Sequence, residues 1–472
     1  MTALHEFSAS ELSAAYQQGS LSPVEATRAV IAHIERWEPQ LCAMYAFDPS
    51  TALAMARTSE ARWLAGAPLS PLDGVPVTIK ENIATRGVPV PMGSAASELT
   101  PAPEDSPPAA RLREAGCVFL GKTTMPDMGM LSSGLSSFHK LARNPWDMRL
   151  NPGGSSAGAG AAAAAGYGPL HVGTDIGGSI RLPAGWCGAF GLKPSGGRVP
   201  IKPPFTGRVA GPMTRTVQDA ALMMAVLSRP DWRDTTSLPP HSIGWDELTI
   251  DVRGLKIGLH LEPGWGLPLN AETASAVNAT ARQFEAAGAI IETVKTFMTR
   301  EAIDGIDKFW RLRSHLDIST LPQHRQDKVL PYIREWAAGG AQLSAAQLYQ
   351  GYSQMAALRE AAVAACQPFD FVIAPVSPVP TYPAEWAGPT NDPARPLEHI
   401  AYTLPYNMSE QPAASVNCGF TASGLPIGLQ IIGQRFDDLG VLRLARAWEL
   451  MRGAQLPWPC PGLAVNDGFS ND

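Results

Sequence analysis

The most informative stretch of this sequence is Gly173-Thr174-Asp175-Ile176-Gly177-Gly178-Ser179-Ile180-Arg181. It continues an apolar run, Leu170–Val172, that predicts a buried strand, so the glycine-set serine lies in the loop where that strand ends. Glycines before a serine leave backbone N–H groups free to point at a developing oxyanion. Ser179 is therefore the candidate nucleophile of this loop.

Two motifs upstream supply what such a serine needs: Val77-Thr78-Ile79-Lys80-Glu81-Asn82 and Pro152-Gly153-Gly154-Ser155-Ser156. A serine hydroxyl is a weak nucleophile and must lose its proton to a nearby base. A lysine can accept that proton only if its pKa, ordinarily ~10.4, is lowered by burial or by a neighbouring cation. Lys80 ends a run typical of a buried strand, and a second hydroxyl could relay the proton between amine and nucleophile.

In combination these motifs resemble the amidase signature family of hydrolases, whose catalytic unit is Ser–cis-Ser–Lys. The resemblance implies that Ser179 is the nucleophile, that Ser155 is the bridging serine after a cis peptide bond, and that Lys80 is the general base. It further implies an oxyanion hole formed by the backbone N–H groups of Ile176, Gly177, Gly178 and Ser179, and it implies no cofactor.

The resemblance runs from about Ser8 to about Glu449. Further matching motifs, in the same order along the chain, are Lys122-Thr123, Arg143–Trp146, Cys187–Pro194, Gly211–Met213 and Gly424–Gln430. The chain departs from the family pattern at Ala157, where a glycine is usual, at Ala159, a small polar or acidic position, and at Met128, which replaces an aromatic residue. These departures leave the expected mechanism intact but put the transfer of substrate preference in doubt.

Strand and helix patterns alternate along the chain, which predicts an α/β layered fold. The family resemblance implies a large mixed twisted sheet sandwiched between layers of helices, with residues 1–472 forming a single domain. Residues 299–342 show no recognisable match to the family and carry several aromatic residues. We interpret this segment as a variable helical region that shapes the substrate entrance, while an ordinary helical outer layer remains the simpler alternative.

Composition limits the possible functions. The 472 residues carry a net charge of −6 and no long basic run, which argues against a nucleic-acid substrate. The six cysteines are scattered, without metal-ligand or disulfide-framework spacing, and the nine histidines form no His-x-x-x-His pair. We expect no metal, no secretory signal and no membrane span, and hence a soluble cytoplasmic protein, either a monomer or a homodimer.

Other residues have two possible roles. An adaptable apolar pocket is indicated by Met125, Met128, Gly129, Met130 and Leu131, although core packing explains the methionines equally well. Ser156 is expected to cap the alanine-rich helix after it, and Asp175 and Arg181 are expected to form an ion pair that fixes the nucleophile loop. Cys187 is more simply a packing residue than a nucleophile.

A rival motif, Gly154-Ser155-Ser156-Ala157-Gly158, satisfies the Gly-x-Ser-x-Gly nucleophile elbow. That elbow must follow a buried strand, whereas turn chemistry precedes it here, and no later histidine lies in a distinctive motif. We therefore reject it.

The sequence predicts a serine-dependent amidohydrolase acting on a small-molecule carboxamide, with anilides and carbamates (urethanes) chemically accessible. The alternative is the glutaminase component of a tRNA-dependent amidotransferase, a family member that delivers ammonia to a partner protein. The departures at Ala157, Ala159 and Met128, and the missing match over residues 299–342, count against that alternative. A non-catalytic relative carries little weight because all three catalytic positions are present.

Overall fold

Eleven strands of one mixed sheet organise the computed structural model, which describes residues 3–460. The strands are β1 (Met44–Tyr45), β2 (Pro76–Lys80), β3 (Val118–Thr123), β4 (Leu170–Asp175), β5 (Phe190–Lys193), β6 (Val209–Thr214), β7 (Lys256–Leu259), β8 (Ile290–Thr293), β9 (Phe371–Pro375), β10 (Ala413–Phe420) and β11 (Pro426–Gly433). Their order across the sheet is β1-β3-β2-β4-β6-β5-β10-β11-β9-β7-β8. The predicted α/β sheet fold is confirmed. The single-domain organisation stays a prediction, which the continuity of the sheet supports.

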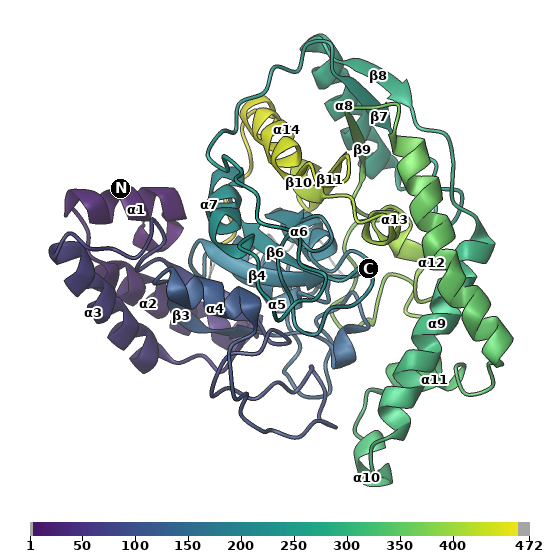
Figure 1. Ribbon diagram of the computed structural model, residues 1–472, viewed down its shortest axis with the longest axis horizontal. Coiled ribbons are helices and arrows are strands. Elements are labelled where there is room, and N and C mark those ends of the chain that lie inside the picture. Colours follow the sequence, from purple (N-terminus) through teal and green to yellow (C-terminus); the bar gives the residue numbers. More distant parts are fainter. Residues whose placement is uncertain (1–2, 461–472) are drawn as a thin grey trace, which may run out of the picture.

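Helices cover both faces of the sheet (Figure 1). One face packs against α1 (Ala9–Gln18), α4 (Pro107–Glu114), α7 (Val217–Leu227), α8 (Ala271–Ala286) and α14 (Asp438–Met451). The other packs against α2 (Pro23–Leu41), α3 (Pro49–Leu64), α5 (Ala157–Ala165), α6 (Arg181–Cys187) and α13 (Leu404–Met408). Two layers of helices therefore enclose the sheet.

The pairing of β2 with β4 positions the chemistry. These strands are parallel neighbours, with Val77 opposite Leu170 and Ile79 opposite Val172. Parallel neighbours end at the same edge of a sheet, so Lys80 lies beside the loop that follows Asp175. Side chains alternate along a strand. Because Val77 and Ile79 face the α7 and α14 layer, Lys80 points to the opposite face, where α5 and α6 lie.

The α5 helix lies very close to its neighbours because it consists only of alanine and glycine. A Cβ atom at Gly158 would lie 2.2 Å from the Ala43 carbonyl oxygen, and one at Gly160 would lie 2.9 Å from the Pro183 Cβ. Real Cβ contacts are longer than this, so both positions accept only glycine without rearrangement. The alanine-rich helix expected after Ser156 is present as α5.

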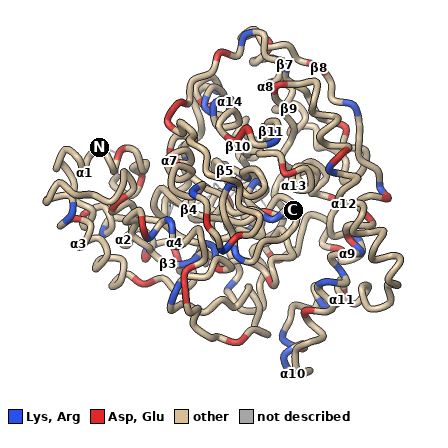
Figure 2. Tube along the Cα trace, viewed as in Figure 1, with Lys and Arg blue, Asp and Glu red and all other residues tan. Residues whose placement is uncertain are grey.

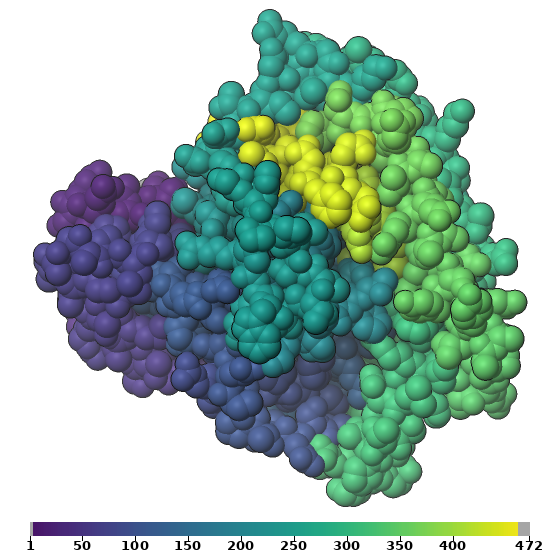
Figure 3. All heavy atoms as spheres, in the orientation of Figure 1, coloured from purple at the N-terminus to yellow at the C-terminus, as the bar shows by residue number. Residues whose placement is uncertain are grey.

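Residues 299–342 are largely helical. They contain α9 (Arg300–Ser319), α10 (Gln323–Gln326) and α11 (Pro331–Ala338), and they lead into α12 (Ala345–Cys366). These helices lie at the side of the molecule opposite α1–α3, as Figures 1 and 3 show. Figure 2 shows positive and negative residues interspersed along the whole trace, with several positive residues on α9–α11. Among residues 3–460, no helix is long and apolar enough to cross a membrane.

Candidate active site

Lys80 is fully buried at the end of β2. Its Nζ lies 2.8 Å from Ser155 Oγ and 3.0 Å from Ser156 Oγ, within hydrogen-bonding range of both. Burial, and then the positive charge of Arg208, lower the pKa of Lys80 well below its ordinary value, while Asp175 and Glu81 act weakly in the other direction. A large neutral fraction of this amine is therefore available at lower pH than for a lysine in water.

Ser155 and Ser156 occupy the two positions before α5, and the Gly154–Ser155 peptide bond is cis. Ser156 is at the N-cap position but its side chain makes no capping hydrogen bond, so the expected capping role is wrong. Instead, Ser156 Oγ donates to the Thr174 carbonyl oxygen at 3.1 Å and accepts from the Thr174 N–H at 3.3 Å. These bonds, together with the contact to Lys80, tie the start of α5 to the end of β4.

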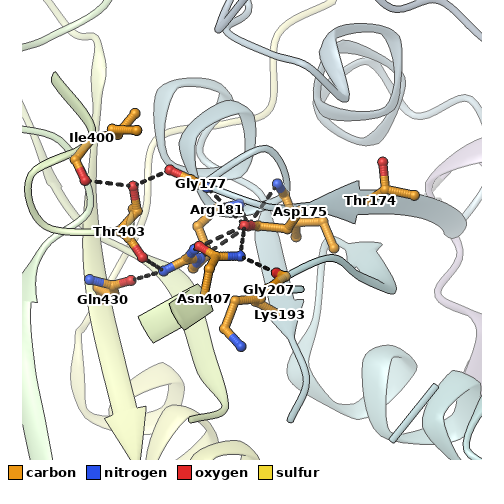
Figure 4. Close-up of polar contacts among 12 residues, drawn as sticks. Thr174, Asp175, Gly177, Arg181, Lys193, Gly207, Ile400, Thr403, Asn407 and Gln430 are labelled. Carbon is orange, nitrogen blue, oxygen red and sulfur yellow. Dashed lines mark hydrogen bonds and ion pairs between the residues drawn. The ribbon is translucent and has the colours of Figure 1, made fainter. Parts of the chain in front are cut away.

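Asp175 and Arg181 form the expected ion pair, with Nη2 2.9 Å from Oδ1 and both side chains fully buried. Burial alone would raise the pKa of Asp175, but Arg181 and the hydrogen bond from Asn407 hold that pKa well below its ordinary value. Arg181 also donates to Gln430 Oε1 and the Thr403 carbonyl oxygen (Figure 4). The nucleophile loop is therefore anchored to α13 and β11.

The backbone N–H groups of the loop divide into two sets. The Gly178 N–H donates to Asp175 Oδ1 at 2.8 Å and the Ile180 N–H donates to Oδ2 at 3.0 Å. The expectation that Gly178 joins the oxyanion hole is therefore corrected, because its donor is already occupied. No acceptor within residues 3–460 takes the N–H of Ile176, Gly177 or Ser179.

Ser179 lines the same cavity as Ser155, and its carbonyl oxygen accepts from the Ser156 N–H at 3.2 Å. The cavity has a volume of about 390 Å³. Its wall includes Asn82, Thr174 and Ile176 from the strand ends, Met128, Gly129 and Met130, and Pro203, Phe205 and Arg208 before β6. From α9 and its end come Arg313, Ser314, Asp317 and Leu321. Ser155 and Ser179 thus line one cavity, and the buried Lys80 amine reaches it through Ser155.

Of the five residues suggested to form an apolar substrate pocket, four line a cavity and one does not. Met128, Gly129 and Met130 line the cavity of about 390 Å³, which is called the main cavity below. Leu131 lines a second cavity of about 50 Å³, and Ser179 lines that one too. Met125 is buried in the core and lines neither cavity. Core packing therefore explains Met125, while the other four residues face the cavities.

Sequence reasoning missed Arg208 and Arg313, which both line the main cavity. Arg208 lies in a proline-rich loop without a distinctive motif. Arg313 could have been found from helical spacing, since Trp310, Arg313, Ser314 and Asp317 share one face of α9 and all line one of the two cavities. Cys187 is buried, and burial raises the pKa of its thiol, which makes it unsuited to nucleophilic attack.

The family model for amidases matches residues 25–442, and the chain belongs to the amidase signature family. Membership of this family makes the protein a hydrolase.

Proteins similar to this chain include amidases and subunits of amidotransferases. The chain is 37% identical over 473 residues to the A subunit of the glutamyl-tRNA(Gln) amidotransferase from Myxococcus xanthus (strain DK1622), covering 93% of this chain and 96% of that protein. The corresponding protein of Chloroflexus aggregans is 35% identical, with 95% and 97% covered. The crystal structure of a bacterial aryl acylamidase of the amidase signature family superimposes with a TM-score of 0.87 at 30% identity, covering 95% and 97% of the two chains.

These alignments correct one expectation. Because the match to the Myxococcus xanthus protein covers 93% of the chain, the missing match over residues 299–342 no longer counts against a role in an amidotransferase.

We expect Arg181→Met to lower the free energy of unfolding by about 3–5 kcal/mol, because it leaves the buried Asp175 carboxylate uncompensated. Chemical denaturation measures this. The matched control is Arg253→Met, whose ion pair with Asp251 is exposed and should leave the unfolding midpoint almost unchanged. Equal effects of the two substitutions would contradict an anchoring role for the buried pair.

Proposed function

We propose that this protein hydrolyses the C–N bond of a carboxamide through an acyl-enzyme on Ser179. The observation that carries the proposal is the direct contact between the buried Lys80 amine and Ser155 Oγ at the cavity that Ser179 lines. Neutral Lys80 takes the proton of Ser155 while Ser155 takes that of Ser179, whose Oγ attacks the carbonyl carbon.

The N–H groups of Ile176, Gly177 and Ser179 hold the oxyanion of the tetrahedral intermediate. The proton returns through Ser155 to the leaving nitrogen, the C–N bond breaks, and ammonia or an amine departs. Water then attacks the acyl-enzyme with the same groups acting in reverse, which releases the acid and restores Ser179. Anilides and carbamates pass through the same kind of intermediate and are within the proposed range.

The α9 helix would select among such substrates, since it contributes residues to the walls of both cavities that Ser179 lines. This contribution supports the entrance-shaping role suggested for residues 299–342. The 30% identity to an aryl acylamidase supports a small-molecule amide as substrate.

The names of the relatives support a second candidate: the glutaminase-type A subunit of a glutamyl-tRNA(Gln) amidotransferase, working with partner proteins. The identity to these relatives, up to 37%, exceeds that to the aryl acylamidase. Both candidates need the same acyl transfer at Ser179, and they differ in substrate and partners.

We expect Ser179→Ala and Lys80→Met each to reduce kcat by about 10³-fold or more while circular dichroism stays unchanged. Lys122→Met is the matched control, because Lys122 is a buried lysine of the adjacent strand whose amine contacts Ile83 and Thr85 and neither serine. Turnover retained by folded Lys80→Met at neutral pH would exclude Lys80 as the base.

The pH dependence of kcat should show an acidic limb, because Lys80 must be neutral to accept a proton. Activity is present above the pKa of Lys80 and is lost as the pH falls through it. Removing a nearby positive charge raises that pKa, so Arg208→Gln should move the limb to higher pH. A limb that stays in place, measured with a saturating neutral amide, would show that Lys80 is not the group that titrates.

The two candidates separate in one assay. The purified chain alone is expected to hydrolyse a simple aryl amide such as acetanilide and to leave glutamine intact. Glutamine hydrolysis that appears only with added partner proteins would favour the amidotransferase role instead.

A further inference from the structure

Two arginines in the wall of the main cavity have no acidic partner. Neither Arg208 nor Arg313 takes part in an ion pair within residues 3–460. Arg208 Nη1 has one long hydrogen bond, 3.4 Å to the Pro203 carbonyl oxygen. Arg313 Nη2 donates to Met130 Sδ at 3.1 Å, and its buried Nε has no acceptor. Most of the donors of both guanidinium groups are therefore unused.

Within residues 3–460 the two most deeply buried arginines are paired, whereas Arg208 and Arg313 are half-buried. Arg181 pairs with Asp175 and Arg198 with Asp438, each through a carboxylate that is itself fully buried. A guanidinium stays charged at neutral pH, and taking a charge out of water without a partner is costly. Arg208 and Arg313 have no such carboxylate and lie in the cavity that Ser179 lines. Among the described residues Arg215 also forms no ion pair, but its Nε and Nη2 donate to the Ala163 and Ala164 carbonyl oxygens at 2.9 and 2.8 Å.

The acidic residues at the cavity do not satisfy them. Asp175 is committed to Arg181. Asp317 lies one turn after Arg313 on α9, but it is exposed and forms no ion pair with Arg313. Burial lowers the pKa of both arginines, and for Arg208 the charge of Arg313 adds to the effect. The charge of Arg313 therefore acts on Arg208, and no carboxylate among the described residues at the cavity balances the two guanidinium charges.

We propose, resting on the amide hydrolysis proposed above, that the substrate carries a carboxylate that Arg208 and Arg313 bind while Ser179 attacks its amide carbonyl. Arginine binds carboxylates through two parallel N–H donors, which the free guanidinium edges can supply. The second cavity, about 50 Å³, adjoins Ser179 and Arg313 and is lined by Leu131, Trp310 and Ile400. This small apolar cavity can accommodate a short hydrocarbon part of the substrate. The substrate class is a carboxylate-bearing aliphatic or aryl amide.

Two matched substrate pairs test this and show on which side of the scissile bond the carboxylate lies. Glutaramate against pentanamide places the charge on the acyl side, and 4-acetamidobenzoate against acetanilide places it on the amine side. The charged member of at least one pair should have a kcat/KM about 10- to 100-fold higher than the neutral member, as expected for hydrogen bonds to a charged group. Equal values within both pairs would overturn the inference while leaving amide hydrolysis established.

Substitutions on α9 test whether Arg313 causes the preference for the charged substrate. Arg313→Gln should abolish the preference for the charged member, and Arg313→Lys should restore part of it. Arg300→Gln is the matched control on the same helix, because Arg300 lies outside both cavities and pairs with Asp304 and Glu398. It should keep the full preference. A preference unchanged in Arg313→Gln contradicts the proposal.

A binding measurement separates this inference from the hydrolysis itself. Ser179→Ala protein is titrated calorimetrically with glutaramate and with 4-acetamidobenzoate, the charged members of the two pairs. Binding of either compound that is lost in Ser179→Ala/Arg313→Gln and kept in Ser179→Ala/Arg300→Gln supports the carboxylate site, even if no amide is turned over. Absence of binding, or equal binding by both double variants, overturns it.

Discussion

The buried ion pair between Asp175 and Arg181 is the interaction on which the rest of the site depends. One carboxylate accepts hydrogen bonds from the Gly178 and Ile180 N–H groups as well as from Arg181, and so fixes the shape of the whole loop. Arg181 extends this anchor to Asn407 on α13 and Gln430 on β11 (Figure 4). A pair buried this deeply is weak evidence for stability in itself. Its value here is geometric, because it leaves the remaining N–H groups of the loop unoccupied.

The charges around the cavity form a consistent arrangement. A lysine acts as a base only when its neutral form is populated, and the fold achieves this by burying Lys80 and by keeping Arg208 unpaired nearby. A carboxylate next to Arg208 would weaken that effect. In the free protein Arg208 therefore helps to keep the amine neutral, and the lack of a protein carboxylate paired with it within residues 3–460 leaves its donors available to the anionic substrate proposed above.

The catalytic residues can be predicted from sequence, because the motifs around Lys80, Ser155 and Ser179 are local. The glycines in the serine motifs point to the chemistry, since they leave backbone N–H groups free. Apolar runs locate the strands β2, β3, β4, β7, β9 and β11. The strands β5, β6 and β10 are interrupted by glycine, proline or polar residues, as β4 and β11 also are, and it is their pairing with neighbours that defines them as strands. The use of the Gly178 N–H by Asp175 and the convergence of Arg208 with Arg313 depend on contacts distant in sequence or on exact loop geometry, which no periodicity reveals.

The contrast between α5 and α9 has an evolutionary consequence. Around α5, Gly158 and Gly160 have no room for even one added carbon, so this part of the molecule can hardly vary in a descendant lineage. The cavity-facing side of α9 carries no member of the Lys80–Ser155–Ser179 set, and its residues can be exchanged without disturbing the amine. New specificities can therefore arise by mutation of a single helix while an inherited reaction centre is conserved.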